Sequence, residues 1–278
     1  ASICLFLRGD LEPAPRGAAV TFNPATLAAG DSRQGRLPPA WDELTPTIQV
    51  GTFLGDRTAR PGTDIVLPAT ASAPANADIV LPGPYEANRG GLIVNQLRER
   101  GWLDKSNVTD LGRKRGQSAN NQFLMDGERD MMVLDTARTA GGYASPGQTI
   151  KTQAAEFTIS GTSATVWVSS LDNASIGTSQ RLLLTHLTDL QNTGVQYAER
   201  GRQTLLAWGK LPHLVATGSA RVALRRENPK LPKAYVLATS GRRIAELPVA
   251  KGAAGTLVFD ITTKGENGAQ LLYELDFR

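Results

Sequence analysis

The chain has few of the residues that build redox, metal or crosslinked sites. Its 278 residues include one cysteine, Cys4, and two histidines, His186 and His213. A single cysteine cannot form an internal disulfide, and a chain of this length buries a sizeable core without one. Neither histidine has another histidine or a cysteine at ligand spacing, which argues against a zinc or copper site. We therefore expect no metal and no cofactor, while cysteine usage leaves the compartment open.

Long apolar runs, phosphate-binding loops and basic stripes are also missing. No apolar run approaches the roughly 18 to 20 residues that a membrane helix needs. Neither the G-x-G-x-x-G pattern nor the P-loop pattern occurs. The net charge of +4 comes from 30 basic and 26 acidic residues that are mostly interspersed, and the densest basic cluster is the short Arg113-Lys114-Arg115. The sequence therefore predicts neither a nucleic-acid partner nor a membrane partner.

No convincing catalytic set is visible. Neither histidine accompanies a nucleophile elbow of the G-x-S-x-G type. Four acids, Asp126, Glu128, Asp130 and Asp135, lie in one predicted hairpin, where turn and rim carboxylates are the simpler interpretation. A carboxylate pair for glycoside hydrolysis can also be assembled from distant positions, which keeps that possibility open. We predict no catalytic residue.

The first residues form an apolar run, from Ser2 to Leu7, which Arg8-Gly9-Asp10 and two prolines then end. Proline and glycine stop a helix, so we read the Arg-Gly-Asp triplet as a helix-terminating turn and not as an integrin motif. Such an apolar tip is expected to pack on something upstream. The start of the chain therefore looks like part of a longer one.

The stretch 17–90 is rich in Ala, Pro, Gly and Thr and contains only short apolar pieces. It predicts a long, irregular, strand-poor connection that wraps a neighbouring surface. Within it, Asp64-Ile65-Val66-Leu67-Pro68 recurs as Asp78-Ile79-Val80-Leu81-Pro82. The repeat marks either paired edge strands, each closed by a proline, or a chance duplication.

One helix is predicted, over residues 91–103. Leu92, Ile93, Gln96, Leu97 and Arg100 follow helical spacing, and Gly101 is able to end the helix. The expected organisation is thus a helical remnant at 1–16, a wrapping segment at 17–107 that includes this helix, and a β-domain at 108–278.

From Gln122 onward the pattern is all strand, with turn residues every 8 to 12 positions. Short strands without intervening helices favour an antiparallel β-sandwich of the jelly-roll or immunoglobulin-like kind. The expected strands are 123–126, 131–135, 155–159, 164–169, 181–188, 195–198, 213–217, 221–225, 234–239, 244–248, 256–261 and 270–276.

Tryptophan offers the only candidate ligand contacts. In the strand 164–169, Trp167 alternates onto the same face as Thr165 and Ser169. An aromatic ring on a polar sheet face can stack on a sugar, but covering a seam with an adjacent domain or lying under a loop is the more common role. Trp102 and Trp41 are further candidates for facing a carbohydrate.

The run Val133–Ala140 is similar to V-D-T-P-R-T-Q-A, and Ser169–Ile176 is similar to S-S-L-D-G-K-P-I. These patterns resemble the C-terminal region of bacterial glycoside hydrolases with an agarase-like, clan-A (β/α)8 barrel. An arginine-plus-leucine strand, Arg181–Thr185, precedes Gln191–Val195, which is similar to N-T-G-M. Leu5–Ala14 resembles L-F-R-R-G-D-V-x-P-A, which ends the last barrel helix in this family. The resemblance covers about 1–15 and 108–225, and the stretch 17–90 departs from it.

The resemblance implies a non-catalytic C-terminal portion of a secreted or periplasmic polysaccharide-degrading enzyme. The family's catalytic carboxylates sit at barrel strands four and seven, upstream of this segment, so no catalytic residue is carried over. The implied partners are an upstream (β/α)8 catalytic domain and a polysaccharide or oligosaccharide. Two alternatives stay open: a stand-alone carbohydrate-binding or adhesive β-sandwich, and a free-standing hydrolase with an unrecognised carboxylate pair.

Overall fold

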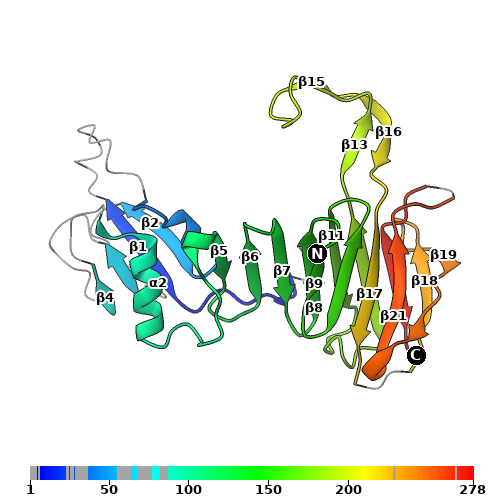
Figure 1. Cartoon of the computed structure of the whole chain (residues 1–278), viewed down its shortest axis with the longest axis horizontal. Coiled ribbons are helices and arrows are strands. Elements are labelled where there is room, and N and C mark those ends of the chain that lie inside the picture. Colours follow the sequence, from blue (N-terminus) through cyan, green and yellow to red (C-terminus); the bar gives the residue numbers. More distant parts are fainter. Residues whose placement is uncertain are drawn as a thin grey trace. The chain divides into compact units, whose positions relative to one another are not determined.

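A computed structural model describes residues 5, 7–22, 25, 28, 37–54, 64–67, 77–81, 87–227, 230–266 and 268–278. The chain is mainly β and divides into two units (Figure 1). Unit 1 comprises residues 1–10 and 131–278, and unit 2 comprises residues 11–130. The predicted mainly-β class is confirmed.

Unit 1 is a β-sandwich of antiparallel strands. One sheet has the order β20-β21-β17-β10-β9, and the strands of the other that belong to unit 1 run β19-β18-β22-β12-β11-β8-β7. The strand bounds are β7 Met131–Asp135, β8 Thr139–Ala144, β9 Thr149–Lys151, β10 Ala155–Ser160, β11 Ala164–Ser170, β12 Arg181–Leu187, β17 Ser219–Arg225, β18 Lys233–Leu237, β19 Arg243–Glu246, β20 Ala250–Lys251, β21 Thr256–Thr262 and β22 Leu272–Asp276. A 3-10 turn at Ala253–Gly255 precedes β21.

Alternation of apolar and polar residues builds this sandwich. Phe157 in β10, Val222 in β17 and Phe259 in β21 lie opposite one another across one sheet and are buried. In the other sheet, alternate residues of β12 are buried in the same way, whereas β11 is buried on both faces from Val166 to Ser170. Because side chains of a strand point to opposite faces at every second residue, each strand supplies one apolar face to a common core. The expected strands between 155 and 187 are therefore found within a residue of their predicted bounds.

Unit 2 contains a parallel sheet in the order β2-β1-β3-β4. Its strands are β1 Gly17–Phe22, β2 Gln49–Leu54, β3 Ile65–Leu67 and β4 Ile79–Val80. The duplicated pentapeptide forms β3 and β4, which pair with Ile65 opposite Ile79 and Val66 opposite Val80. The repeat therefore marks two paired strands, of which only β4 is an edge. Pro68 and Pro82 lie outside the described residues.

Helix α2, Gly90–Glu99, packs on one face of this sheet through its own buried apolar side chains (Figure 1). Ile93, Val94 and Leu97 are buried in the core of unit 2 together with residues of β1 and β3. Gly101 ends the helix in a left-handed conformation with φ of +69°, and the N–H of Trp102 donates to the carbonyl of Leu97. These are the features of a Schellman cap, which glycine adopts without strain. The predicted helix is confirmed, with its C-terminal end at Glu99.

The remaining elements of unit 2 are the 3-10 turns η2 Asp42–Leu44 and η4 Leu111–Arg113 and the hairpin of β5 Arg115–Gln117 and β6 Phe123–Asp126. The stretch 17–90 is thus more regular than its composition predicts. Its strands are two to six residues long. Because they are parallel, no short hairpin turn joins them, and the sequence therefore carries no turn pattern that predicts their pairing. At the N-terminus, Leu5 and Leu7 have helical backbone conformation.

Candidate interaction arm

A two-stranded ribbon leaves the sandwich of unit 1 between β12 and β17 (Figure 1). We call residues 188–217 the arm. Its inner part pairs β13 Leu190–Thr193 with β16 Lys210–Val215, and its outer part pairs β14 Gln196–Tyr197 with β15 Leu205–Ala207. At the base, the Thr188 hydroxyl donates to the carbonyl of Ala216 at 2.6 Å, and the N–H of Ala216 donates to the carbonyl of Asp189 at 2.8 Å.

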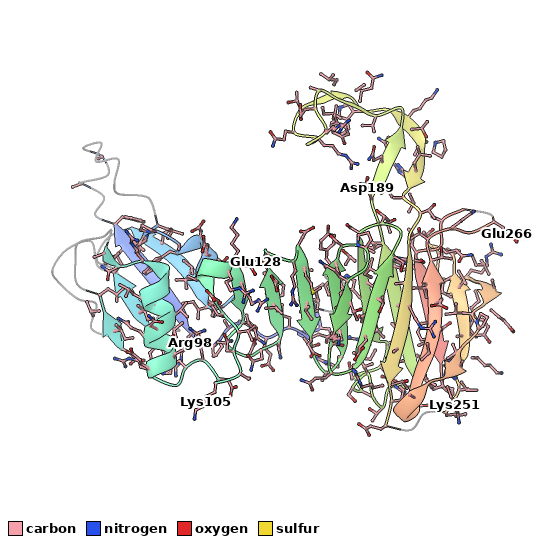
Figure 2. All side chains as sticks on the ribbon, in the orientation of Figure 1. Arg98, Lys105, Glu128, Asp189, Lys251 and Glu266 are labelled. Atoms are coloured by element: carbon pink, nitrogen blue, oxygen red, sulfur yellow. The ribbon has the colours of Figure 1, made fainter. Side chains whose placement is uncertain are left out.

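Polar side chains hold the ribbon in shape. The guanidinium of Arg202 donates to both oxygens of Asp189, at 2.9 and 2.8 Å, and lies 6.0 Å from the ring centre of Tyr197. Figure 2 labels Asp189 at the start of the arm. The hydrogen bonds from Arg202 lower the pKa of the Asp189 carboxyl. Across the ribbon, Asn192 donates to the carbonyl of Trp208 at 2.8 Å and shares a 2.7 Å hydrogen bond with His213 Nδ1.

The turn that leads into β16 requires a glycine, Gly209. Gly209 has φ of +69°, and a Cβ atom there would lie 2.6 Å from the carbonyl oxygen of Thr193. A larger residue would therefore force the two strands apart. The arm is a defined hairpin and its shape depends on this close approach.

The arm exposes a concentration of large apolar side chains. Among the described residues, fourteen large hydrophobic side chains are exposed, and five of them lie on the arm: Leu190, Leu206, Trp208, Leu211 and Leu214. Trp208 is 77% exposed and Leu211 is 70% exposed. A two-stranded ribbon has no second layer to cover its faces, and an isolated hairpin is marginally stable in water. The concentration of exposed apolar side chains on one element makes the arm a candidate for binding a partner.

The three tryptophans that the sequence suggested are buried or partly buried, unlike Trp208. Trp41 is fully buried in unit 2 and donates its indole N–H to the carbonyl of Asn88 at 2.7 Å. Trp167 is 7% exposed, so its ring offers no face to a sugar although it lies opposite the apolar face of β11. Trp102 is partly buried beneath two guanidinium groups, those of Arg16 at 4.3 Å and Arg100 at 5.4 Å.

Trp208 does not lie on a strand in which apolar and polar residues alternate, so the pattern that points to Trp167 does not point to it. Trp208 follows Leu205-Leu206-Ala207 in a run that shows no alternation and is close to Gly209. The signal that could have revealed Trp208 is an unbroken apolar run between turn residues, in which no polar residue alternates with the apolar ones. The tertiary placement of that run outside the sandwich decides its exposure.

The contacts of three acids of the predicted hairpin, Asp126, Glu128 and Asp135, are described by the structure. Asp126 is buried; burial opposes its ionisation, but hydrogen bonds from Arg115 hold the pKa of its carboxyl below the usual value. Glu128 pairs with Arg113 at 2.9 Å on the surface. Burial raises the pKa of Asp135, whose carboxylate accepts the N–H of Gln153 at 2.9 Å. Asp126 and Glu128 therefore act as ion-pair partners.

Asp10 holds the Arg8-Gly9-Asp10 turn on the sandwich. Its side chain has no exposed area and contacts Arg8 at 2.5 Å, Arg138 at 3.0 Å and the hydroxyl of Thr139 at 2.7 Å. Arg138 also donates to the carbonyls of Arg8 and Gly9. Burial opposes ionisation of Asp10, but hydrogen bonds from Arg8 and Thr139 lower the pKa of its carboxyl. We call this group the Asp10 clamp. A buried aspartate cannot serve as an integrin ligand.

Searches of the described part of the chain found neither a membrane-spanning helix nor a cluster of three or more metal-ligating side chains. Comparison of the chain with protein-family models, with curated proteins and with solved structures found no match in any of the three.

Proposed function

We propose that this chain is the non-catalytic C-terminal portion of a secreted or periplasmic polysaccharide-degrading glycoside hydrolase. Unit 1 supports an upstream (β/α)8 catalytic domain, and the arm is the part of unit 1 that contacts it. In this arrangement the exposed ring of Trp208 is available to line one wall of the substrate cleft. The observation that carries the proposal is the concentration of exposed apolar side chains on the arm.

An arm without a partner leaves its large apolar side chains in water. Burying a leucine side chain contributes roughly 1.5 to 3 kcal/mol relative to leaving it in water. Leu206, Leu211 and Leu214 are each more than half exposed, so most of this stabilisation is available to a partner and not to the isolated chain. Aromatic residues such as Trp208 frequently dominate interface energies. A neighbouring domain would therefore stabilise both the interface and the ribbon itself.

The Asp10 clamp supports the same proposal. It ties the segment that resembles the end of the last barrel helix to strands β8 and β11 of the sandwich. An upstream domain would then be joined to a chain that is anchored on unit 1 at Asp10, as a support for a catalytic domain requires. In this proposal the family resemblance points to a barrel as that domain, and the clamp is its point of attachment.

The test compares this chain with the complete protein encoded by its reading frame. An upstream frame that encodes a (β/α)8 barrel is expected. Amide hydrogen exchange of the arm should then be at least about tenfold slower in the complete protein, because an interface protects backbone amides. Strand β19, which is exposed, serves as the internal reference. Equal exchange of the arm in both proteins would rule out the arm as the interface.

A pair of variants locates the contact. Leu211→Ser in the complete protein is expected to restore fast exchange of the arm, whereas Ile244→Ser, which alters an exposed apolar side chain of β19, should not. The readout does not depend on the identity of the polysaccharide. A Leu211→Ser protein with wild-type protection would contradict the assignment.

The exposure of Trp208 also favours a second function, a stand-alone carbohydrate-binding β-sandwich. That reading predicts glycan binding by the 278-residue chain alone and loss of binding in Trp208→Ala. An upstream frame without a barrel, together with such binding, would replace the first proposal by the second.

A further inference from the structure

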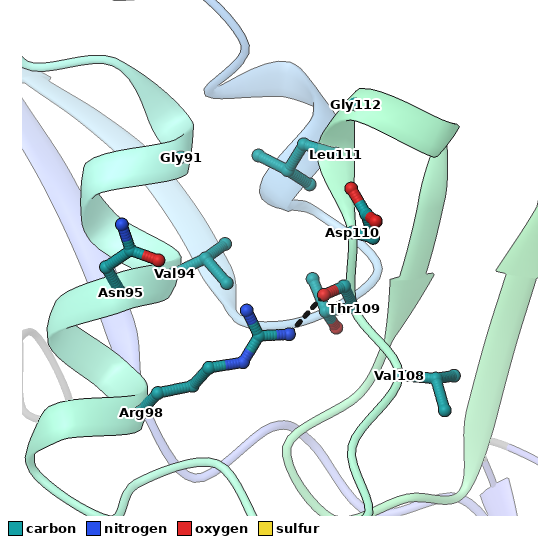
Figure 3. A pocket seen from close by; sticks show the side chains of 9 residues that line it. All are labelled: Gly91, Val94, Asn95, Arg98, Val108, Thr109, Asp110, Leu111 and Gly112. Atoms are coloured by element: carbon teal, nitrogen blue, oxygen red, sulfur yellow. Dashed lines mark hydrogen bonds between the residues drawn. The ribbon is translucent and has the colours of Figure 1, made fainter.

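Unit 2 contains a cleft between helix α2 and the segment that leads into η4. The cleft has a volume of about 470 Å³, within the range of roughly 300 to 1,000 Å³ that small-molecule sites occupy. Figure 3 shows Arg98 reaching from α2 across the cleft to Thr109, with Asn95 on the same helix and Asp110 on the facing segment. All of these residues belong to unit 2.

The facing segment is held in place by buried hydrogen bonds. Thr109 has no exposed area, its N–H donates to the Asn107 side chain at 3.1 Å, and its hydroxyl is 3.2 Å from that of Thr47. One nitrogen of Arg98, Nη2, donates to the carbonyl of Thr109. This bond fixes the guanidinium across the cleft, so the site is preorganised on both sides.

Three polar groups at the cleft keep hydrogen-bonding capacity. Among the described residues, neither the remaining nitrogens of Arg98, nor the Asn95 amide, nor the Asp110 carboxylate makes a side-chain hydrogen bond. Asn95 and Arg98 are three residues apart on α2 and therefore lie on the same face of the helix. The three groups supply donors, acceptors and an amide that does both.

An apolar surface lies next to these groups. Val94 is buried in the core of unit 2, and Leu111 packs against that core while also lining the cleft. Gly91 lines the cleft as well, and a Cβ atom there would meet nothing within 4 Å. The absence of a side chain at this position leaves the cleft open beside the first turn of α2.

We propose that this cleft binds a neutral polyhydroxylated ligand, a single sugar unit. One guanidinium and one carboxylate line it, so a ligand with a single net charge would meet one like charge as well as one opposite charge. Hydroxyl groups both donate and accept, and two adjacent hydroxyls can bridge the Arg98 guanidinium and the Asp110 carboxylate. The C–H groups of a pyranose would pack on the partly buried side chain of Leu111. This inference rests neither on the arm nor on the proposed parent enzyme.

The test uses the 278-residue chain and ligand-observed NMR with glucose, galactose and mannose, and with glycine and inorganic phosphate for comparison. Saturation transfer to at least one sugar at about 10 mM is expected, a concentration at which a ligand with a dissociation constant of about 1 mM occupies most of the sites. Absence of transfer to all three sugars would overturn the proposal. Binding of glycine or phosphate without sugar binding would also overturn it, because the ligand would then be ionic.

Matched variants place the ligand in the cleft. Asp110→Asn is expected to weaken sugar binding about fivefold, because it removes a charged acceptor at a partly solvated site. Glu99→Gln removes the same charge from the exposed end of α2 and should leave binding unchanged. Equal effects of the two variants would place the ligand elsewhere.

A second pair tests the cleft by its shape. Gly91→Phe fills the open space beside α2 and should abolish binding, while Leu92→Phe, at an exposed neighbouring position, should not. Retained binding in Gly91→Phe would overturn the location. Circular dichroism of all four variants shows whether each one is folded.

Discussion

His186 provides the sharpest test of how the sandwich is built, because it is a titratable group inside the apolar core. It lies in β12 opposite Val166 of β11, and its side chain points to the same face as Leu182 and Leu184. The side chain has no exposed area, and neither ring nitrogen has a hydrogen-bond partner among the described residues. Burial lowers the pKa of His186 from 6.5 to about 4, since the charged imidazolium loses its hydration there.

The sign of the pH dependence follows from this shift. Between pH 6.5 and 4 the unfolded chain binds a proton at His186 while the folded chain does not, so the free energy of unfolding falls as the pH falls. With pKa values of 6.5 and about 4, the contribution lost between pH 7.5 and pH 5 is about 2 kcal/mol, and the full loss below pH 4 is about 3 kcal/mol. Above pH 6.5 the histidine is neutral in both states and its contribution no longer changes.

Replacing His186 by leucine removes this dependence while keeping a side chain of similar size. At pH 7.5 the variant should be at least as stable as the wild type, because two unsatisfied buried nitrogens disappear. Between pH 7.5 and 5 the wild type should lose about 2 kcal/mol more than His186→Leu. His213→Leu, which removes the histidine of the arm and keeps His186, should retain the loss.

Urea unfolding at pH 7.5, 6 and 5 measures these differences, with hydrogen exchange of peptides from β11 and β12 reporting on unit 1. Carboxylates with lowered pKa values, such as Asp10 and Asp276, lose their contribution only below about pH 4, the ordinary aspartate value. They are common to both proteins and cancel in the comparison. Equal losses in the wild type and His186→Leu would refute a buried, neutral His186.

Two further predictions concern the clamp and the central sheet. Asp10→Asn should destabilise unit 1 by about 2 to 3 kcal/mol, because it leaves two arginines without their buried counter-ion, while Glu128→Gln, which breaks an exposed pair, should cost less than about 1 kcal/mol in urea unfolding. Gly142→Ala would place a Cβ atom 1.9 Å from a backbone oxygen of β7, so we expect little soluble protein, whereas Gly91→Ala, with free space in a helix, should raise the thermal midpoint. A soluble Gly142→Ala protein of wild-type stability would contradict the packing of β7 on β8.

Local sequence patterns are sufficient to predict the strands and the helix whose signals lie within a few neighbouring residues. The strands at 123–126 and 131–135 were predicted at their observed bounds, because alternation and flanking turn residues act within a few positions. The helix was predicted because its apolar spacing and its closing Gly101 lie in one short stretch. Strand β8, Thr139–Ala144, escaped prediction because Gly141 and Gly142 lower its strand propensity. Both glycines are needed because the backbones of neighbouring strands approach them closely, and this close approach depends on the tertiary structure.

Tertiary structure decided which polar and aromatic residues are buried. Trp167 follows the polar side of its strand and yet is buried, whereas Trp208 lies in an apolar run and is exposed. Asp10 looked like part of a surface turn, but it is buried because Arg138, which is 128 positions away along the chain, folds against it. The strands of the parallel sheet in unit 2 pair with partners more than 10 residues away, so no local sequence pattern predicts this sheet. Exposure and long-range pairing are properties of the assembled chain, because they depend on what each residue meets in space and not on its neighbours in sequence.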